Sequence, residues 1–189
     1  MPLEKSTREH IVESADVLFY QRGFEHTSFA DIANEVKISR GNFYHHFKTK
    51  DEILESVIKL RLHRTQEMLN RWEADGQNPA ERIGKFLHML VMNQAKIKLY
   101  GCPVGTLCTE LAKMDHASKT HANKLMSLFR TWLGKQFAAA GCKKEADELA
   151  LHILARSQGI ATLANTFHDE KFIKNEVRQM EEWLQSKIS

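Results

Sequence analysis

The sequence predicts an all-α protein, and the reasons lie in its composition and residue spacing. Its 189 residues include only three prolines and nine glycines, the two residue types that most disfavour helix interiors. Hydrophobic residues make up 42% of the chain, and in most segments they recur three or four positions apart, as on one face of a helix. A chain of this length and apolar content can bury a core in one large domain or two small ones.

The first helix is expected to start at Ser6 or Thr7 and to end at Gly23. Its inward face is formed by Ile11, Ala15, Leu18 and Phe19. A glycine just after the last residue of such a pattern commonly ends a helix, because glycine adopts the required backbone without steric cost. We expect this helix to brace the two that follow.

The stretch Thr27–Lys50 predicts two short helices joined by a tight turn. Ser39 can cap the second of them, and Phe43 and Phe47, four residues apart, share its inward face. The residues left facing outward are Arg40, Gly41, Asn42, Tyr44 and His45. Arg and Asn side chains read base edges in the major groove, and glycine lets the backbone approach a phosphate. The pattern favours a DNA-reading helix-turn-helix, although a structural helical corner has the same geometry.

Charge supports the DNA interpretation locally rather than over the whole chain, whose net charge is only +3. Residues 1–64 carry ten Lys or Arg and ten Asp or Glu, whereas residues 36–50 carry four basic residues and no acidic one. The basic charge is therefore concentrated on one small surface, as expected of a phosphate-contacting patch. We expect phosphate contacts from Thr27, Ser28, Gly41 and Lys50, the last at the start of a helix whose N–H groups also favour an anion.

About sixty N-terminal residues resemble the DNA-binding domain of the tetracycline-repressor (TetR) family. The resemblance rests on Gly23-Phe24, Thr27-Ser28, Asp31-Ile32-Ala33, the run Ser39–Phe47 and Lys50-Asp51-Glu52-Ile53-Leu54. It implies a one-component transcriptional regulator, most often a repressor. Lys37 departs from the family, which usually places glycine at this turn, so Lys37 must adopt a left-handed backbone or the turn must change shape.

A long helix is expected to begin at Thr49 or Lys50 and to run without Pro or Gly to about Glu73. It would be a rod of about 35 Å that connects the DNA-binding helices to the rest of the chain. We expect a helix-turn-helix domain over residues 1–50, this connecting helix over about 50–73, and a regulatory and dimerisation domain over 51–189. The working boundary between the two domains lies within the long helix.

The remaining helices are expected over 79–99, from Pro103, over 117–140, 145–167 and 170–188. Gly76, Asn78 and Pro79 predict the turn before the first of these, Gly101 ends that helix, and Gly141 ends the helix over 117–140. The last two helices are too apolar to form only a lid, and Gly159 allows a close helix crossing. We expect them to pack against their copy in a homodimer as a four-helix bundle, with closure of their own subunit as the alternative.

Cys102 is expected at the N-cap of the helix that Pro103 begins. A thiol at the positive end of a helix dipole is favoured as the reactive thiolate. The stretch GCPVGTLCTEL is similar to a segment of family members that respond to electrophiles or oxidants. Cys102 is therefore a redox candidate, although Cys102 and Cys108 could equally be small buried residues.

A dimer implies a near-palindromic double-stranded DNA operator, because two recognition helices bind sites one turn of duplex apart. A small-molecule effector would act by binding one separation of the two helices better than the other. Candidate pocket residues are Leu62, Phe86, Met89, Asn93, Cys102, Leu111, Phe129 and Trp132. Each could instead belong to the ordinary core, and a DNA-binding protein switched only by its thiol is the alternative.

The sequence lacks the motifs of metal-dependent enzymes, serine hydrolases and nucleotide-binding proteins. The ten histidines include no HExxH spacing, and the chain has no CxxC pair, GxSxG elbow or phosphate-binding glycine loop. We therefore expect no enzyme activity, no bound metal and no cofactor. No apolar run approaches the roughly eighteen residues of a membrane span, the N-terminal stretch has no apolar signal core, and three cysteines predict no disulfide framework. These features predict a cytoplasmic protein.

Overall fold

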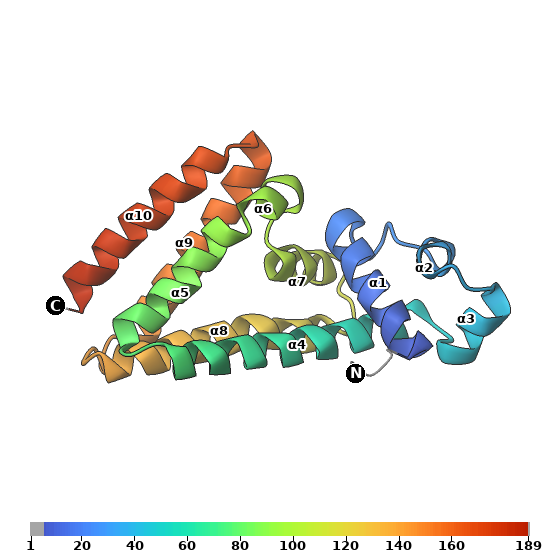
Figure 1. Cartoon of the computed structure of the whole chain (residues 1–189), viewed down its shortest axis with the longest axis horizontal. Coiled ribbons are helices and arrows are strands. Elements are labelled where there is room, and N and C mark those ends of the chain that lie inside the picture. The colour runs from blue at the N-terminus through green and yellow to red at the C-terminus, as the bar shows by residue number, and fades with distance from the viewer. Residues whose placement is uncertain (1–5, 189) are drawn as a thin grey trace. The chain divides into compact units, whose positions relative to one another are not determined.

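The computed structural model describes residues 6–188, and within that range the chain forms helices joined by short turns, which confirms the predicted all-α fold (Figure 1). Residues 1–5 and 189 lie outside the described range, and with them the first and last residues of the predicted domains. No helix in the described range is long and apolar enough to cross a membrane.

The helices form two compact units. One contains the residues up to His63 together with Thr106–Asn123, and the other contains Arg64–Gly105 and the residues from Lys124 onward. The division falls within the long helix. Thr106–Asn123 belongs to the N-terminal unit, and its residues Leu107, Leu111 and Ala122 are buried in that unit's core.

The N-terminal unit is built from α1 (Thr7–Arg22), α2 (Phe29–Val36), α3 (Arg40–His46) and the part of α4 (Lys50–Asp75) up to His63. The end of α7 (Pro103–Lys113) and the start of α8 (Lys119–Ala139) complete it. Ser6 begins α1 with a capping box closed by Glu9, and Gly23 ends it with φ of 90°. The buried side chains that hold the unit together include Ile11, Phe19, Phe24, Ile32, Phe43, Phe47, Ile53 and Leu54.

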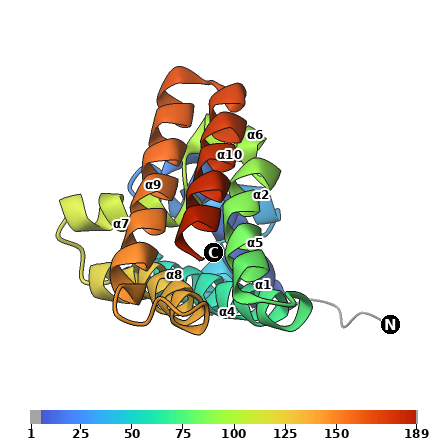
Figure 2. The ribbon, with the colours of Figure 1, turned by 90° about the vertical axis from the view of Figure 1, so that its left-hand side faces the viewer.

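The second unit contains α5 (Pro79–Met92), α6 (Gln94–Tyr100), α9 (Ala146–Phe167) and α10 (Glu170–Lys187), with the remaining parts of α4, α7 and α8. Helix α10 packs against both α5 and α9, and α6 packs against α9 (Figure 2). Aromatic pairs form part of the core, with ring centroids 5.5 Å apart for Phe86 and Phe129 and 5.7 Å apart for Trp72 and Trp132.

One predicted helix is divided in the structure. The sequence predicts a single helix over 79–99, but α5 ends at Met92 and α6 begins at Gln94. Asn93 lies between them with φ of −103° and ψ of 10°, and its side-chain amide donates to the Met89 carbonyl at 2.8 Å. A short polar side chain that bonds nearby backbone in this way competes with the regular helix.

Candidate nucleic-acid interface

Helix α2 begins with two reciprocal hydrogen bonds between Ser28 and Asp31. The Ser28 hydroxyl accepts from the Asp31 backbone N–H at 3.1 Å, and the Asp31 carboxylate accepts from the Ser28 N–H at 2.8 Å. Hydrogen bonds from the hydroxyl and the backbone of Ser28, together with the charge of Arg22, hold the pKa of the Asp31 carboxyl below its ordinary value. Ser28 is exposed at this helix start, where an anion is favoured by the free N–H groups and the dipole.

The turn between α2 and α3 passes through Lys37 in the left-handed region, with φ of 58° and ψ of 41°. Of the two outcomes considered for this lysine, the structure shows the strained backbone rather than a reshaped turn. The Lys37 N–H donates to the Asn34 carbonyl at 3.2 Å, which closes the end of α2. Its side chain is exposed and adds a positive charge beside the start of α3.

Helix α3 presents the outward face that the sequence predicts. The Ser39 hydroxyl caps it by accepting from the Asn42 N–H at 3.3 Å, and the side chains of Phe43 and Phe47 are buried below it. The exposed residues on the other side are Arg40, Gly41, Asn42, Tyr44 and His45. No atom lies within 4 Å of where a Gly41 Cβ would stand, so the backbone is open to close approach at this position.

A shallow groove of about 230 Å³ runs between α2 and α3. Its lining residues are Ser28, Phe29, Ala30, Ala33, Arg40, Phe43 and Tyr44. The groove thus brings together Ser28, Arg40 and Tyr44, three of the eight predicted DNA contacts. Phe29 is one of the lining residues, and the centroid of its ring is 5.2 Å from that of Phe43 and 5.5 Å from that of Tyr44.

Thr27 is the clearest departure from the predicted set of contacts. Its side chain is fully buried, and its hydroxyl donates to the Gly23 carbonyl at 2.7 Å. A buried hydroxyl with its proton already engaged is not available to a phosphate. Thr27 therefore fastens the loop between α1 and α2 rather than facing DNA.

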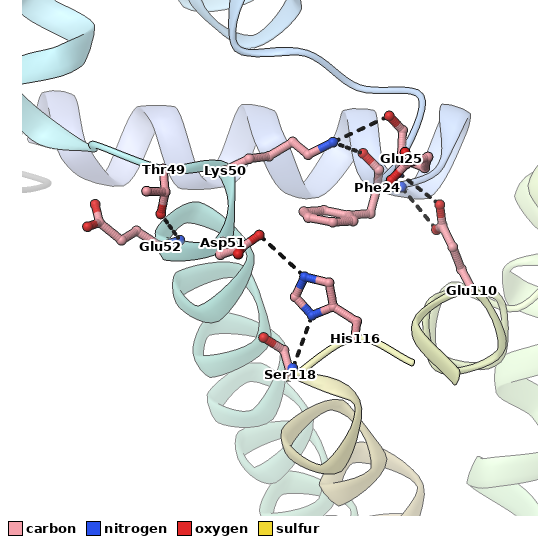
Figure 3. Close-up of polar contacts among 9 residues, drawn as sticks. All are labelled: Phe24, Glu25, Thr49, Lys50, Asp51, Glu52, Glu110, His116 and Ser118. Carbon is pink, nitrogen blue, oxygen red and sulfur yellow. Dashed lines mark hydrogen bonds and ion pairs between the residues drawn. The ribbon is translucent and has the colours of Figure 1, made fainter. Parts of the chain in front are cut away.

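Lys50 is also engaged within the protein. Its ammonium donates to the carbonyls of Phe24 and Glu25 at 3.0 and 3.3 Å and lies 4.3 Å from the centroid of the Phe24 ring (Figure 3). These contacts give Lys50 a structural role in the same loop. They could not be foreseen from the sequence, because the partners lie about 25 residues away in the chain.

Arg8 supports α3 from α1, and sequence reasoning missed it. Its guanidinium donates to the His46 carbonyl at 2.8 Å and lies 4.0 Å from the centroid of the Phe47 ring. A cation at the end of a helix satisfies a carbonyl that has no partner in the helix and is favoured by the dipole. Only the tertiary fold brings Arg8 there, since 38 residues separate it from His46.

The α7–α8 segment contributes three further side chains to the N-terminal unit that the sequence did not indicate. The Glu110 carboxylate accepts from the backbone N–H groups of Phe24 and Glu25 at 3.0 and 2.9 Å. His116 contacts Asp51 at 3.3 Å (Figure 3), and His121 contacts Glu55 at 2.5 Å. Burial would raise the pKa of the Glu55 carboxyl, but hydrogen bonds from Ser118 and His121 outweigh it and lower this pKa.

The predicted effector-site residues are divided between the two units. Phe86, Phe129 and Trp132 are buried in the core of the second unit, with Met89 and Cys102 packed against it. Leu111 is buried in the core of the N-terminal unit and Leu62 packs against that core, whereas Asn93 is exposed at the break between α5 and α6. The indole Nε1 of Trp132 is buried and has no hydrogen-bond partner among residues 6–188.

Cys102 stands at the start of α7, as predicted. Its Sγ accepts from the Gly105 N–H at 3.4 Å, the bond expected of an N-cap residue. The side chain is half-buried. A Cβ at Gly105 would lie 2.2 Å from Oε1 of Gln158, so the glycine allows α9 to approach the first turn of α7.

Comparison with known proteins agrees with this geometry. Residues 11–57 match the family described as bacterial regulatory proteins, tetR family. The chain is 28% identical over 169 residues to an uncharacterized HTH-type transcriptional regulator in the lacX 3′ region of Lactococcus lactis subsp. lactis, and the match covers 87% of this chain and 86% of that protein.

Solved structures share the fold over nearly the whole chain. A TetR transcriptional regulator from Legionella pneumophila superposes with a TM-score of 0.86 at 21% identity, covering 99% of this chain and 100% of that one. Escherichia coli NemR in its reduced form superposes with a TM-score of 0.77 at 18% identity, covering 92% of this chain and 94% of that one. Residues 11–57 thus match the helix-turn-helix of the tetR family, and the chain as a whole has the fold of these solved regulators.

Proposed function

We propose that the protein is a homodimeric repressor that binds a near-palindromic operator through α3 and releases it in response to an effector. The observation that carries the proposal is the face of α3, where Arg40, Asn42, Tyr44 and His45 are exposed over the buried Phe43. A dimer on its operator blocks access of other proteins to the DNA it covers. Repression therefore requires no contact beyond DNA binding itself.

On DNA, Arg40 and Asn42 have the side chains that best read base edges in the major groove. Ser28 and Gly41 would approach phosphates, one from the start of α2 and one from the bare backbone of α3. The exposed Lys37 and Lys48 add positive charge on the same surface. Thr27 and Lys50 take no part in this proposal, because both are engaged inside the protein.

Dimerisation is supported by an exposed apolar stripe on α9. Leu151, Ala155, Gly159, Leu163 and Phe167 are all exposed, and each lies four residues after the one before. Leu163 is 43% exposed and Phe167 71% exposed. Residues four apart form a ridge that packs into the groove of a facing helix, and a Cβ at Gly159 would meet no atom within 4 Å. We infer that the same stripe of a second copy covers it, with α9 and α10 contributing to a four-helix bundle.

The effector that best fits the second unit is a small aromatic or apolar compound with a hydrogen-bond acceptor. The unpartnered Nε1 of Trp132 supports this choice, because a buried N–H without a partner costs free energy that a bound carbonyl or phenolate oxygen would recover. Phe86, Met89 and Phe129 would supply apolar contacts in the same core. Replacing Trp132 with Phe should remove the response to such compounds, whereas Trp183→Phe on α10 should keep it.

A thiol switch without any small-molecule pocket is the second candidate, and the Gly105-to-Cys102 hydrogen bond favours it. In this case the Cys102 thiolate attacks an electrophile, forming a carbon–sulfur bond as the leaving group departs. Iodoacetamide at neutral pH followed by peptide mapping tests the idea, with Cys102→Ser as the control. The candidate fails if Cys102 is alkylated no faster than a free peptide thiol.

Selection of duplex DNA from a random pool tests the DNA-binding function. The proposal expects a preferred sequence with two inverted half-sites. Recovery of unrelated sequences, bound no more tightly than the unselected pool from low to high salt, would contradict it. Titrating the selected complex with hydrogen peroxide and, separately, with small aromatic carbonyl compounds then separates the thiol switch from the pocket.

A further inference from the structure

We propose that Glu110 is a positioning residue for the DNA-reading helices, holding the loop between α1 and α2 from outside the helix-turn-helix. The inference deepens the proposed function and rests on it. Glu110 lies on α7, which begins in one compact unit and ends in the other. A displacement of α7 would therefore reach the DNA-binding surface through this side chain.

Both carboxylate oxygens of Glu110 are used on consecutive peptide groups. Oε2 accepts from the Phe24 N–H at 3.0 Å and Oε1 accepts from the Glu25 N–H at 2.9 Å (Figure 3). Hydrogen bonds to an ionised group are shorter and stronger than those between neutral groups. Two such bonds to adjacent residues fix the loop in both position and orientation.

Gly23 makes room for this contact. A Cβ at this position would lie 2.9 Å from Oε1 of Glu110, and the glycine backbone has φ of +90°. A residue with a side chain would strain the backbone and press on the carboxylate. Because Gly23 has no Cβ, the Glu110 carboxylate can approach the loop closely enough to bond it.

The same two residues are held on their carbonyl side by Lys50. Its ammonium donates to the carbonyls of Phe24 and Glu25 at 3.0 and 3.3 Å. Glu110 from α7 and Lys50 from α4 therefore bind complementary groups of one short loop. His116 adds a third contact, with its ring 5.2 Å from the Phe24 ring, and it also reaches Asp51 on α4 at 3.3 Å.

The position of the loop affects the position of the recognition helix through contacts made by the few residues that follow the loop. Gly23 accepts from the Thr27 hydroxyl at 2.7 Å, and the next residue, Ser28, caps α2. The first residue of α2, Phe29, packs against Phe43 of α3 with ring centroids 5.2 Å apart. Loss of the Glu110 contacts would therefore alter the placement of α2 and α3 without touching any DNA-facing side chain.

The test compares Glu110→Gln with Glu25→Gln on the duplex that the wild-type protein selects from a random pool. Both substitutions remove one negative charge from the same part of the unit, but only the first removes a carboxylate that holds the loop. Electrostatics alone would tighten DNA binding in both, because an acidic group opposes phosphates. Positioning by Glu110 predicts that Glu110→Gln weakens binding at least about tenfold, the factor for one lost hydrogen bond to a charged group, whereas Glu25→Gln binds as tightly as the wild type or more tightly.

Two further measurements separate positioning from general loss of structure. The slope of log Kd against log salt should be unchanged in Glu110→Gln, because no phosphate contact is lost. In the wild type bound to its duplex, the amide protons of Phe24 and Glu25 should exchange far more slowly than in a free peptide, which tests the contact even if the variant does not fold. Wild-type affinity in Glu110→Gln, or free-peptide exchange at both amides in the complex, overturns the inference while leaving the DNA-binding function intact. Failure of the wild type to select any duplex contradicts the function itself.

Discussion

The ring of Phe29, the first residue of α2, packs edge-on against the ring of Phe43 in α3, with centroids 5.2 Å and planes 84° apart. Edge-to-face packing is a preferred arrangement of aromatic pairs. It ties the start of one helix of the helix-turn-helix to the middle of the other. The exposed residues of α3 therefore take their direction from a contact on its buried side.

The N-cap residue of α3, Ser39, should contribute more to the stability of the protein than its exposed position suggests. Helix α3 has only seven residues, so it has little stability of its own. Replacing Ser39 with Ala removes the hydroxyl that accepts from the Asn42 N–H and should lower the free energy of unfolding by about 1 kcal/mol. Urea unfolding measures the loss, and Ser39→Thr, which keeps a capping hydroxyl, should recover most of it.

Arg40 should contribute sequence preference as well as affinity. Arg40→Ala should weaken binding to the selected duplex by about 1–3 kcal/mol and flatten the preference at one base position in each half-site. Competition assays with single-base variants of the duplex measure both effects. Arg178→Ala, on the exposed side of α10, is the control and should bind like the wild type. An equal loss for all sequences would show that Arg40 contacts phosphate only.

Much of this surface could be predicted from the sequence because its determinants are local. Ser39, Phe43 and Phe47 lie within one short helix and its cap, so spacing alone indicates which residues face outward. The positions of Glu110, Arg8 and Lys50 depend on partners between 25 and 86 residues away. No pattern along the chain indicates such contacts, and for this reason the sequence alone predicts a phosphate contact for Lys50.

The division of the helix predicted over 79–99 has a similar origin. The apolar spacing continues across Asn93, so periodicity indicates one helix. In the structure the Asn93 side chain bonds the Met89 carbonyl where the helix is interrupted. Asparagine can make such a bond in a continuous helix or at a break, so its presence in the sequence does not predict the break. The place of Thr106–Asn123 in the N-terminal unit also depends on tertiary contacts, since Leu107 and Leu111 are buried in that unit's core.

The contact between α8 and α4 should weaken in acid. The pKa of the Glu55 carboxyl is lowered in the folded protein, where Ser118 and His121 bond it and the charge of Lys59 adds to their effect. A lowered pKa means that this stabilisation is complete above the ordinary value of 4.5 and is lost as pH falls below it through the folded-state pKa. The stability difference between the wild type and Glu55→Gln should therefore shrink from pH 7 to pH 3.5 in thermal unfolding. A difference that stays constant over this range would exclude Glu55 as the titrating group.

The exposed stripe on α9 should control assembly. Leu163→Glu places a charge in the middle of this stripe, and burial of an unpaired carboxylate between two copies is costly. The variant should sediment as a monomer at concentrations where the wild type is a dimer, and it should bind the selected duplex more weakly. Lys135→Glu on α8 introduces the same side chain at an exposed position outside α9 and α10 and should remain dimeric. Unchanged assembly of Leu163→Glu would place the dimer contact elsewhere.

The most direct test is the stoichiometry and footprint of the wild-type protein on its selected duplex. Sedimentation should give two protomers bound together, and hydroxyl-radical footprinting should show two inverted half-sites with centres about 34–36 Å apart along the duplex. A single protomer protecting one half-site, or protection that follows no sequence, would contradict the proposal that paired α3 helices read the operator.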